Sequence, residues 1–295
     1  MVWAADPKAD PFSEETQKSA NPGYGISPTR SYLKSAAAEA QQSPADLAKY
    51  LRLHLGLRTK QETKYLDLTA WDRNGSLVDE PKLAGRQAYG GLDLASTSDL
   101  NALCWLFPAE VGFDAIWRLW TPEENLEALD KRTAGMATVW VREGFLTLTP
   151  GSVSDYDFIR VQINRDRAAF DVRALAVDPW NAQQLTNDLM SDNAPVVKMP
   201  QTLAHMSAPT KELQRILLEG TAERPMFRHG GNPAVRWQAD NFAVWMDANG
   251  NVKPNKAIAA DKIDAIAAAI NAMSLVLAME PKRVSKYETS DLIVV

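Results

Sequence analysis

The chain has 295 residues, a net charge of −5 and an apolar fraction of 45%. That length and composition allow one large domain or two smaller ones, each with a buried core. The net negative charge excludes a protein that is basic as a whole, so any contact with nucleic acid must come from a local patch. A single cysteine, Cys104, excludes a disulfide framework and indicates a reducing cytoplasm. No signal peptide and no membrane-spanning apolar run are recognised, so we expect no membrane contact.

Residues 1–85 are expected to form a leader without an independent core. Proline and glycine interrupt residues 1–30, which excludes long regular elements there. Two helices are predicted over residues 31–55, separated at Ser43-Pro44, with Ser43 as the N-cap and Pro44 at the first helical position. Residues 56–85 indicate an irregular, polar connector.

Strands and helices alternate over residues 86–280, and residues 281–295 are expected to form a flexible tail. Two strands, over 88–94 and 100–107, flank a turn of small residues at 96–99, and a third over 112–120 completes an antiparallel meander. The apolar run 172–177 is typical of a buried parallel strand, and 194–199 is the next strand. Helices are predicted over 122–132, 154–169, 178–190, 207–219 and 261–278, with short hairpins over 138–149 and 242–250. This order predicts an α/β fold with an RNase H-like mixed sheet, in which three antiparallel strands and further parallel strands are flanked by helices.

Three aspartates occupy matching positions in this plan. Asp93 lies in the first strand, where a carboxylate is unusual and costly to bury. Asp178 follows the buried strand, at the end where ligands collect in open α/β sheets. Asp264 lies in the first turn of the last helix. Each has a structural alternative: a solvent-facing edge strand for Asp93, an N-cap before Pro179 for Asp178, and a helix-dipole or capping role for Asp264.

The three aspartates are more informative together than singly. In the expected fold, the first strand, its parallel neighbour and the last helix meet at one edge of the sheet. Three carboxylates at that edge would repel one another, and Mg²⁺ or Mn²⁺ would remove the conflict because both ions prefer carboxylate oxygens. Two such ions about 4 Å apart activate water and stabilise the leaving oxygen in phosphodiester hydrolysis.

Several ordered motifs give the chain a more specific resemblance. They include Gly90-Gly-Leu-Asp-Leu-Ala-Ser-Thr-Ser-Asp-Leu-Asn-Ala-Leu103, Val177-Asp-Pro-Trp-Asn-Ala-Gln-Gln-Leu185 and residues 228–241, 250–256 and 261–264. These motifs resemble those of the large terminase subunits of tailed bacteriophages. Segments 10–12, 20–23 and 43–47 resemble the part of that family that joins its motor to its nuclease, so the similarity covers nearly the whole chain.

The resemblance implies a genome-packaging enzyme with an N-terminal ATPase motor and a C-terminal two-metal nuclease. Such a nuclease cuts concatemeric double-stranded DNA to genome lengths in the cytoplasm of the host cell. By this resemblance Asp93, Asp178 and Asp264 are the catalytic residues and hold two divalent cations, Mg²⁺ or Mn²⁺, with Asp261 as a possible substitute ligand. The expected partners are double-stranded DNA, the terminase ATPase motor, the small terminase subunit and the portal protein.

The sequence departs from the family pattern in two places. The motor's phosphate-binding string, G-x-x-x-x-G-K-[ST], does not occur, so we expect the chain to be the nuclease half with its linker. Ala265 stands where relatives often have glycine or proline, a change expected to have little effect.

Five basic residues are candidate contacts to DNA phosphates: Arg228, His229, Arg236, Lys256 and Lys262. Acidic residues are interspersed among them, which equally favours an ordinary solvated face. For His229, in a glycine-rich loop, a surface or turn role is the structural alternative.

Two other functions compete with a nuclease. An actin-like or sugar-kinase-type ATPase also has an aspartate in its opening strand followed by small hydroxyl residues. However, its phosphate loop requires glycine where Ala95 stands, and no second Asp-x-Gly lobe is found. The other alternative is a noncatalytic docking module of the packaging motor, in which the three aspartates serve as helix caps.

Overall fold

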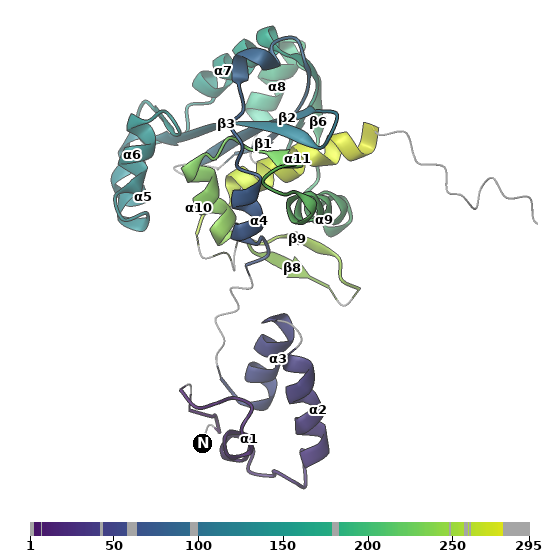
Figure 1. Ribbon diagram of the computed structural model, residues 1–295. Helices are drawn as coiled ribbons and strands as arrows, with labels where there is room; N and C mark the ends of the chain where they lie inside the picture. The colour runs from purple at the N-terminus through teal and green to yellow at the C-terminus, as the bar shows by residue number, and fades with distance from the viewer. Residues whose placement is uncertain are drawn as a thin grey trace, which may run out of the picture. The chain divides into compact units, whose positions relative to one another are not determined.

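The computed structural model describes residues 3–6, 8–41, 44–57, 64–94, 100–178, 183–247, 249–256, 259 and 261–279 (Figure 1). The chain divides into two compact units, Met1–Thr63 and Lys64–Val295. Within the described residues, every helix is too short or too polar to traverse a lipid bilayer.

The first unit contains three helices: α1 (Glu14–Ala20), α2 (Arg30–Ala40) and α3 (Pro44–His54). The two helices expected over 31–55 are therefore present, whereas the expected cap Ser43 lies outside the described residues. Ala20, Ala37 and Leu55 are buried in a small core around Tyr50, whose hydroxyl accepts a hydrogen bond from Gln17 Nε2 at 3.0 Å. The leader thus has an apolar cluster of its own, which the sequence analysis did not anticipate.

The second unit is built on one mixed sheet in the order β4-β3-β2-β1-β5-β6, with β7 paired to β3. Strands β1, β2 and β3 form the expected antiparallel meander, and β5 pairs with β1 in parallel. Strand β6 extends this parallel part, while β4 and β7 both pair in parallel with β3. The strands are β1 (Gln87–Asp93), β2 (Asn101–Pro108), β3 (Phe113–Pro122), β4 (Thr147–Thr149), β5 (Asp171–Val177), β6 (Val196–Lys198) and β7 (Phe227–Arg228). The predicted mixed sheet is confirmed.

Helices cover both faces of this sheet (Figure 1). The first group lies on one face and comprises α7 (Tyr156–Ala169) and α8 (Gln183–Ser191). The second group lies on the opposite face and comprises α4 (Leu68–Arg73), α9 (Leu203–Glu219), α10 (Pro233–Asn241) and α11 (Asp264–Met279). The remaining elements are η1 (Glu80–Leu83), η2 (Glu123–Asn125), α5 (Leu126–Arg132), α6 (Met136–Arg142) and the separate antiparallel hairpin β8 (Val244–Met246)–β9 (Val252–Pro254).

Alternation along the strands divides the core between the two faces. Leu92 and Trp105 pack with Ile159 and Ile163 of α7 on one side. Cys104, the residue before Trp105 in β2, faces the opposite side and packs in the apolar cluster that includes α9, α10 and α11. Both faces of the sheet are therefore apolar and covered, as the nearly continuous apolar strands predict.

Two local predictions were wrong. The segment over 138–149 was expected to be a hairpin, but it forms α6 followed by β4. Thr133, Ala137 and Trp140 are all buried at helical spacing. Burial of this helical face therefore outweighs the strand preference of Val139 and Val141. The supposed irregular connector contains α4, which begins after the N-cap Asp67 and buries Trp71 completely. For this reason the sheet unit begins at Lys64 rather than at Arg86.

A glycine in β1 sets the distance between the sheet and α11. A Cβ atom on Gly91 would overlap the backbone of Ala268 and Ala272, so only glycine allows the helix to lie this close to the strand. Asp93 is two residues farther along β1 and therefore faces the same side as Gly91. The close contact brings the helix and the Asp93 carboxylate to one face of the sheet.

Candidate active site

Asp93 and Asp178 lie at the carboxyl ends of neighbouring parallel strands. Leu92 of β1 and Val177 of β5 are register partners, and each is followed directly by one of these aspartates. Asp93 is 5% exposed, and Asp178 is partly exposed at the mouth of a pocket. The ends of parallel strands are where open α/β sheets gather ligands, so the register alone brings two carboxylates to such a position.

Asp264 reaches the same region from a different element, because it is the first residue of α11. Its side chain is 5% exposed. The backbone N–H of Ala265, in the first turn of that helix, donates to Gln238 Oε1 of α10 at 2.8 Å. Gln238 of α10 therefore accepts from one of the backbone N–H groups at the start of α11, and the Asp264 carboxylate faces Lys256.

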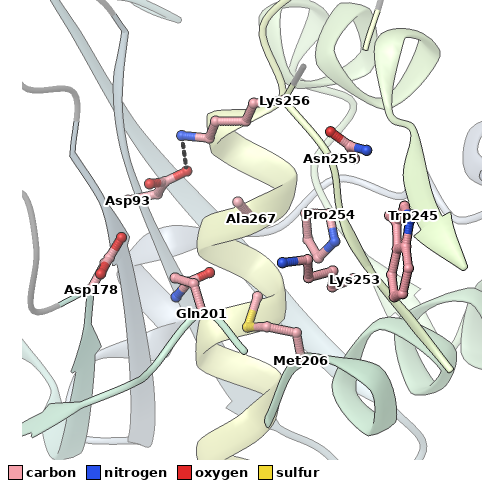
Figure 2. Close-up of a pocket in the computed structure, with 10 residues that line it drawn as sticks. All are labelled: Asp93, Asp178, Gln201, Met206, Trp245, Lys253, Pro254, Asn255, Lys256 and Ala267. Carbon is pink, nitrogen blue, oxygen red and sulfur yellow. Dashed lines mark ion pairs between the residues drawn. The ribbon is translucent and has the colours of Figure 1, made fainter. Parts of the chain in front are cut away.

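Lys256 joins two of the three carboxylates. Its Nζ lies 2.8 Å from Asp93 Oδ2 and 2.6 Å from Asp264 Oδ1; Figure 2 shows the first of these ion pairs. The Lys256 side chain is 53% exposed, whereas those of Asp93 and Asp264 are 7% and 5% exposed. A half-exposed lysine side chain thus bridges two buried carboxylates.

Burial is the main reason that the pKa of Asp93 is raised, to about 6. The Lys256 ammonium opposes this shift, while the negative charges of Asp264 and Asp178 add to it. The pKa of Lys256 is also raised, because the two carboxylates outweigh the effect of its burial. Asp93 is therefore the group on which the charges of Lys256, Asp264 and Asp178 all act.

A pocket of about 550 Å³ opens beside these residues (Figure 2). Asp93 and Asp178 line one side, with Gln201 and Met206 below them in the view of Figure 2. Trp245 of β8 and the β9 residues Lys253 and Pro254 form the other side, and Ala267 of α11 lies between. The backbone N–H of Val252 donates to Ser207 Oγ at 3.1 Å, which ties the hairpin to α9. The pocket thus combines an acidic wall with a basic, aromatic one.

The donor set fits a divalent cation. As the side chains stand, no group of three or more His, Cys, Asp or Glu residues in the described part of the chain is arranged to hold a metal ion. However, Asp264 Oδ2 is buried without a hydrogen-bond partner. Asp93 Oδ2 is also buried, and it makes an ion pair with Lys256. Buried carboxylate oxygens require a positive partner, and Mg²⁺ and Mn²⁺ are the ions that such oxygens prefer. In this structure the Lys256 ammonium is a positive partner of both carboxylates.

The hydrogen-bonded amides of Asn271 and Gln201 support the end of β1, and neither was predicted from the sequence as a site residue. Asn271 of α11 is fully buried; its Nδ2 donates to Leu92 O at 3.0 Å, and its Oδ1 accepts from Gln201 Nε2 at 3.1 Å. Asn271 therefore fixes the backbone immediately before Asp93 and links it to the pocket wall. The available signal was a polar residue within the otherwise apolar Ala-rich stripe of the last helix.

Asp261 lies apart from the bridging lysine. Its carboxylate pairs with Arg132 and accepts a hydrogen bond from its neighbour's backbone, Lys262 N, at 2.9 Å. In this arrangement Asp264, and not Asp261, faces Lys256 and Asp93. The structural alternative for Asp178, an N-cap before Pro179, involves residues 179–182, which lie outside the described residues.

The other candidate DNA contacts are engaged within the protein to different degrees. His229 is 2% exposed, packs against Trp71 with ring centroids 4.2 Å apart, and its Nε2 lies 2.9 Å from Trp71 O. Burial lowers its pKa, so the neutral ring is a core component. Arg228 pairs with Asp114 and donates to two backbone carbonyls at 3.0 Å.

Arg236 and Lys262 lie on more open parts of the surface. Arg236 is 47% exposed and makes two hydrogen bonds, of 2.7 and 2.8 Å, to Asp72. Lys262 is adjacent to Asp261 and partly exposed. Of the five basic candidates, only Lys256 lines the pocket beside the aspartates.

Comparison with known proteins gives a consistent result. A family model described as "Terminase large subunit, endonuclease domain" matches residues 1–280. The large terminase subunit of Enterobacteria phage HK97 is 30% identical over 270 residues, which cover 90% of this chain and 52% of that protein. Protein YmfN of Escherichia coli K12 is 28% identical over 294 residues, covering 95% of this chain and 63% of that protein.

A solved structure agrees with the sequence matches. The crystal structure of the HK97 bacteriophage large terminase superposes with a TM-score of 0.65 at 29% identity, covering 93% of this chain and 56% of that one. The chain therefore spans roughly half to three fifths of the length of these relatives.

Proposed function

Because the chain belongs to the family of terminase large subunit endonuclease domains, we propose that it is a metal-dependent endonuclease. Its substrate in this proposal is concatemeric double-stranded viral DNA, which it cuts during genome packaging in the host cytoplasm. The family and the RNase H-like fold establish a nuclease-domain relationship. The substrate, the two-metal chemistry and the roles of the residues belong to the proposal.

One observation supports the proposal: Asp93 and Asp264, from separate elements, share the Lys256 ammonium, and Asp178 lines the same pocket as Asp93. The β1–β5 register brings Asp93 and Asp178 together, and Lys256 links Asp93 to Asp264 on α11. Residues so far apart in the sequence have no shared capping role. A pocket beside them is large enough to admit part of a nucleic-acid backbone.

In this proposal Asp93, Asp178 and Asp264 hold two divalent cations, Mg²⁺ or Mn²⁺. Bound cations supply an activated water and neutralise the leaving oxygen of the phosphodiester. Asp93 and Asp264 are held rigidly, on a central strand and at a buried helix end, so their oxygens are preorganised to receive the positive charge. Asn271 keeps Asp93 in position through its hydrogen bond to Leu92 O.

The positive side chains of the pocket orient DNA in this account. Lys253 and Lys256 face the acidic wall and provide charges for backbone phosphates. The wider set of partners, namely the ATPase motor, the small terminase subunit and the portal protein, is proposed on family membership alone.

A plasmid-nicking assay tests this function. Supercoiled plasmid is incubated with the wild-type chain and Mn²⁺, with Mg²⁺, or with Mn²⁺ and a chelator. We expect nicked and linear products with either ion and intact plasmid with the chelator. A folded, pure protein that leaves plasmid intact with both ions would contradict the proposal and favour the noncatalytic docking module. Binding of ATP by the same preparation would instead favour the actin-like or sugar-kinase-type alternative.

A further inference from the structure

The placement of Lys256 sets a condition on metal binding. Its ammonium lies 2.8 Å from an Asp93 oxygen and 2.6 Å from an Asp264 oxygen, which are the distances of strong charge-assisted hydrogen bonds. A divalent cation that used these same oxygens would be within a few ångströms of the ammonium. The two positive charges would repel strongly in a site this buried.

We propose that Lys256 is a tethered cation that occupies the candidate metal site and must be displaced before Asp93 and Asp264 can bind a divalent ion. This inference rests on the metal site of the proposed function and adds a control step to it. When no metal is bound, the lysine offsets one of the two negative charges of these carboxylates, and it competes with the metal for them.

The exposure of the three side chains supports displacement of the lysine rather than of the aspartates. Asp93 and Asp264 are almost fully buried on β1 and α11, whereas half of the Lys256 side chain is in solvent. The lysine has a flexible four-carbon stem and a strongly hydrated ammonium, so the group can swing into the pocket without moving the backbone. Exchange therefore requires one side-chain movement.

The displaced ammonium would remain in a pocket that suits a phosphodiester. Lys253 lines the same pocket, so the two lysines together would present two positive charges opposite the acidic wall. A DNA phosphate that accepts a hydrogen bond from the Lys256 ammonium would hold this lysine away from the Asp93 and Asp264 carboxylates. Binding of DNA and binding of metal should then strengthen each other, because such coupling is reciprocal.

Direct measurement of Mn²⁺ affinity without DNA tests the inference. Free Mn²⁺ is followed by electron paramagnetic resonance during titration of the wild-type chain, Lys256→Met, Lys256→Arg and Lys253→Met. We expect Lys256→Met to bind Mn²⁺ about tenfold or more tightly than wild type, because one competing charge is removed. Lys256→Arg retains a cation and should stay close to wild type.

Lys253→Met is the matched control, since it removes one positive charge from the same pocket but not from the Asp93–Asp264 bridge. We expect it to change Mn²⁺ affinity by no more than about threefold. If Lys256→Met binds Mn²⁺ no more tightly than Lys253→Met does, Lys256 is not a competitor and the inference is overturned.

A second measurement uses only the wild-type chain, which covers the case in which Lys256→Met fails to fold. Lysines are acetylated briefly with a reactive ester, with and without Mn²⁺, and the modified sites are quantified by mass spectrometry. Release of Lys256 should raise its acetylation severalfold on addition of Mn²⁺ relative to that of Lys253. Equal changes at the two lysines would contradict displacement.

The two proposals fail in different ways. A wild-type chain that binds no Mn²⁺ and nicks no plasmid would contradict the proposed function itself. A wild-type chain that binds Mn²⁺ and nicks plasmid, with unchanged affinity in Lys256→Met and unchanged Lys256 acetylation, would overturn only the tethered-cation inference.

Discussion

Asp93 and Asp178 stand side by side because the residues before them, Leu92 and Val177, are partners in the parallel pairing of β1 with β5. A shift of that register by one residue would turn one carboxylate to the opposite face of the sheet. The acidic wall of the pocket is therefore a property of strand pairing. Asp264 is added by α11, whose close contact with β1 depends on Gly91.

Asp93→Asn is expected to lower the rate of plasmid nicking by at least about a hundredfold. Asparagine keeps the shape of the side chain but removes the negative charge that attracts a cation. Circular dichroism and urea unfolding would show whether the variant is folded. Nicking close to the wild-type rate by a folded Asp93→Asn protein would refute its role as a ligand.

A comparison of Asp264→Asn with Asp261→Asn distinguishes the two aspartates near the start of α11. Asp264 faces Lys256, whereas Asp261 pairs with Arg132 on α5. We expect Asp264→Asn to lose nicking and Asp261→Asn to retain most of it, because the Asp261 carboxylate is paired with Arg132 and does not contact Lys256. The reverse result would make Asp261 the ligand.

Gly91→Ala should destabilise the sheet unit and weaken nicking together. The added methyl group overlaps the backbone of α11, and relief of that overlap moves the helix that carries Asp264. We expect a loss of about 1–3 kcal/mol in the free energy of unfolding, measured with urea. Gly135→Ala is the control: its φ of 85° makes alanine strained, at a cost of about 1 kcal/mol, but no atom lies near the new methyl group. Nicking by Gly135→Ala should be unchanged, and equal loss in both variants would count against the role of the helix contact.

The sequence was sufficient to predict the mixed sheet and the elements that carry the three aspartates, whose role as metal ligands stays a prediction. Buried parallel strands are short apolar runs, so the run ending at Val177 marked both a central strand and the position of Asp178 at its end. Contacts between distant elements were not readable in the same way. Lys256 was noted only as a possible phosphate contact, because nothing local indicates that residue 256 meets residue 93. The α6 segment was misread since its β-branched residues favour a strand, while burial of Ala137 and Trp140 decides for a helix.

His229 predicts a pH dependence that is independent of the acidic site. Burial lowers the pKa of His229 in the folded state, so the unfolded chain binds a proton more readily. The free energy of unfolding should therefore fall as pH drops below about 6.5, the ordinary histidine pKa. His229→Gln has no titrating group at that position, so the stability advantage of wild type over this variant should shrink between pH 8 and pH 5. A difference that stays constant across urea titrations in this range would contradict the assignment.

Thermal unfolding across a Mn²⁺ titration at pH 7.5 tests, without DNA, whether Asp93 belongs to a cation-binding cluster. Burial raises the pKa of Asp93 in the folded state to about 6, so its contribution to stability is lost as pH rises through that value. Metal-free Asp93→Asn should therefore melt no lower than metal-free wild type at this pH. With Mn²⁺ at a hundredfold excess over Kd, wild type should gain about 2.7 kcal/mol, a rise of several degrees in Tm. The account predicts that this rise shrinks strongly in Asp93→Asn, and the same rise in both proteins would contradict it.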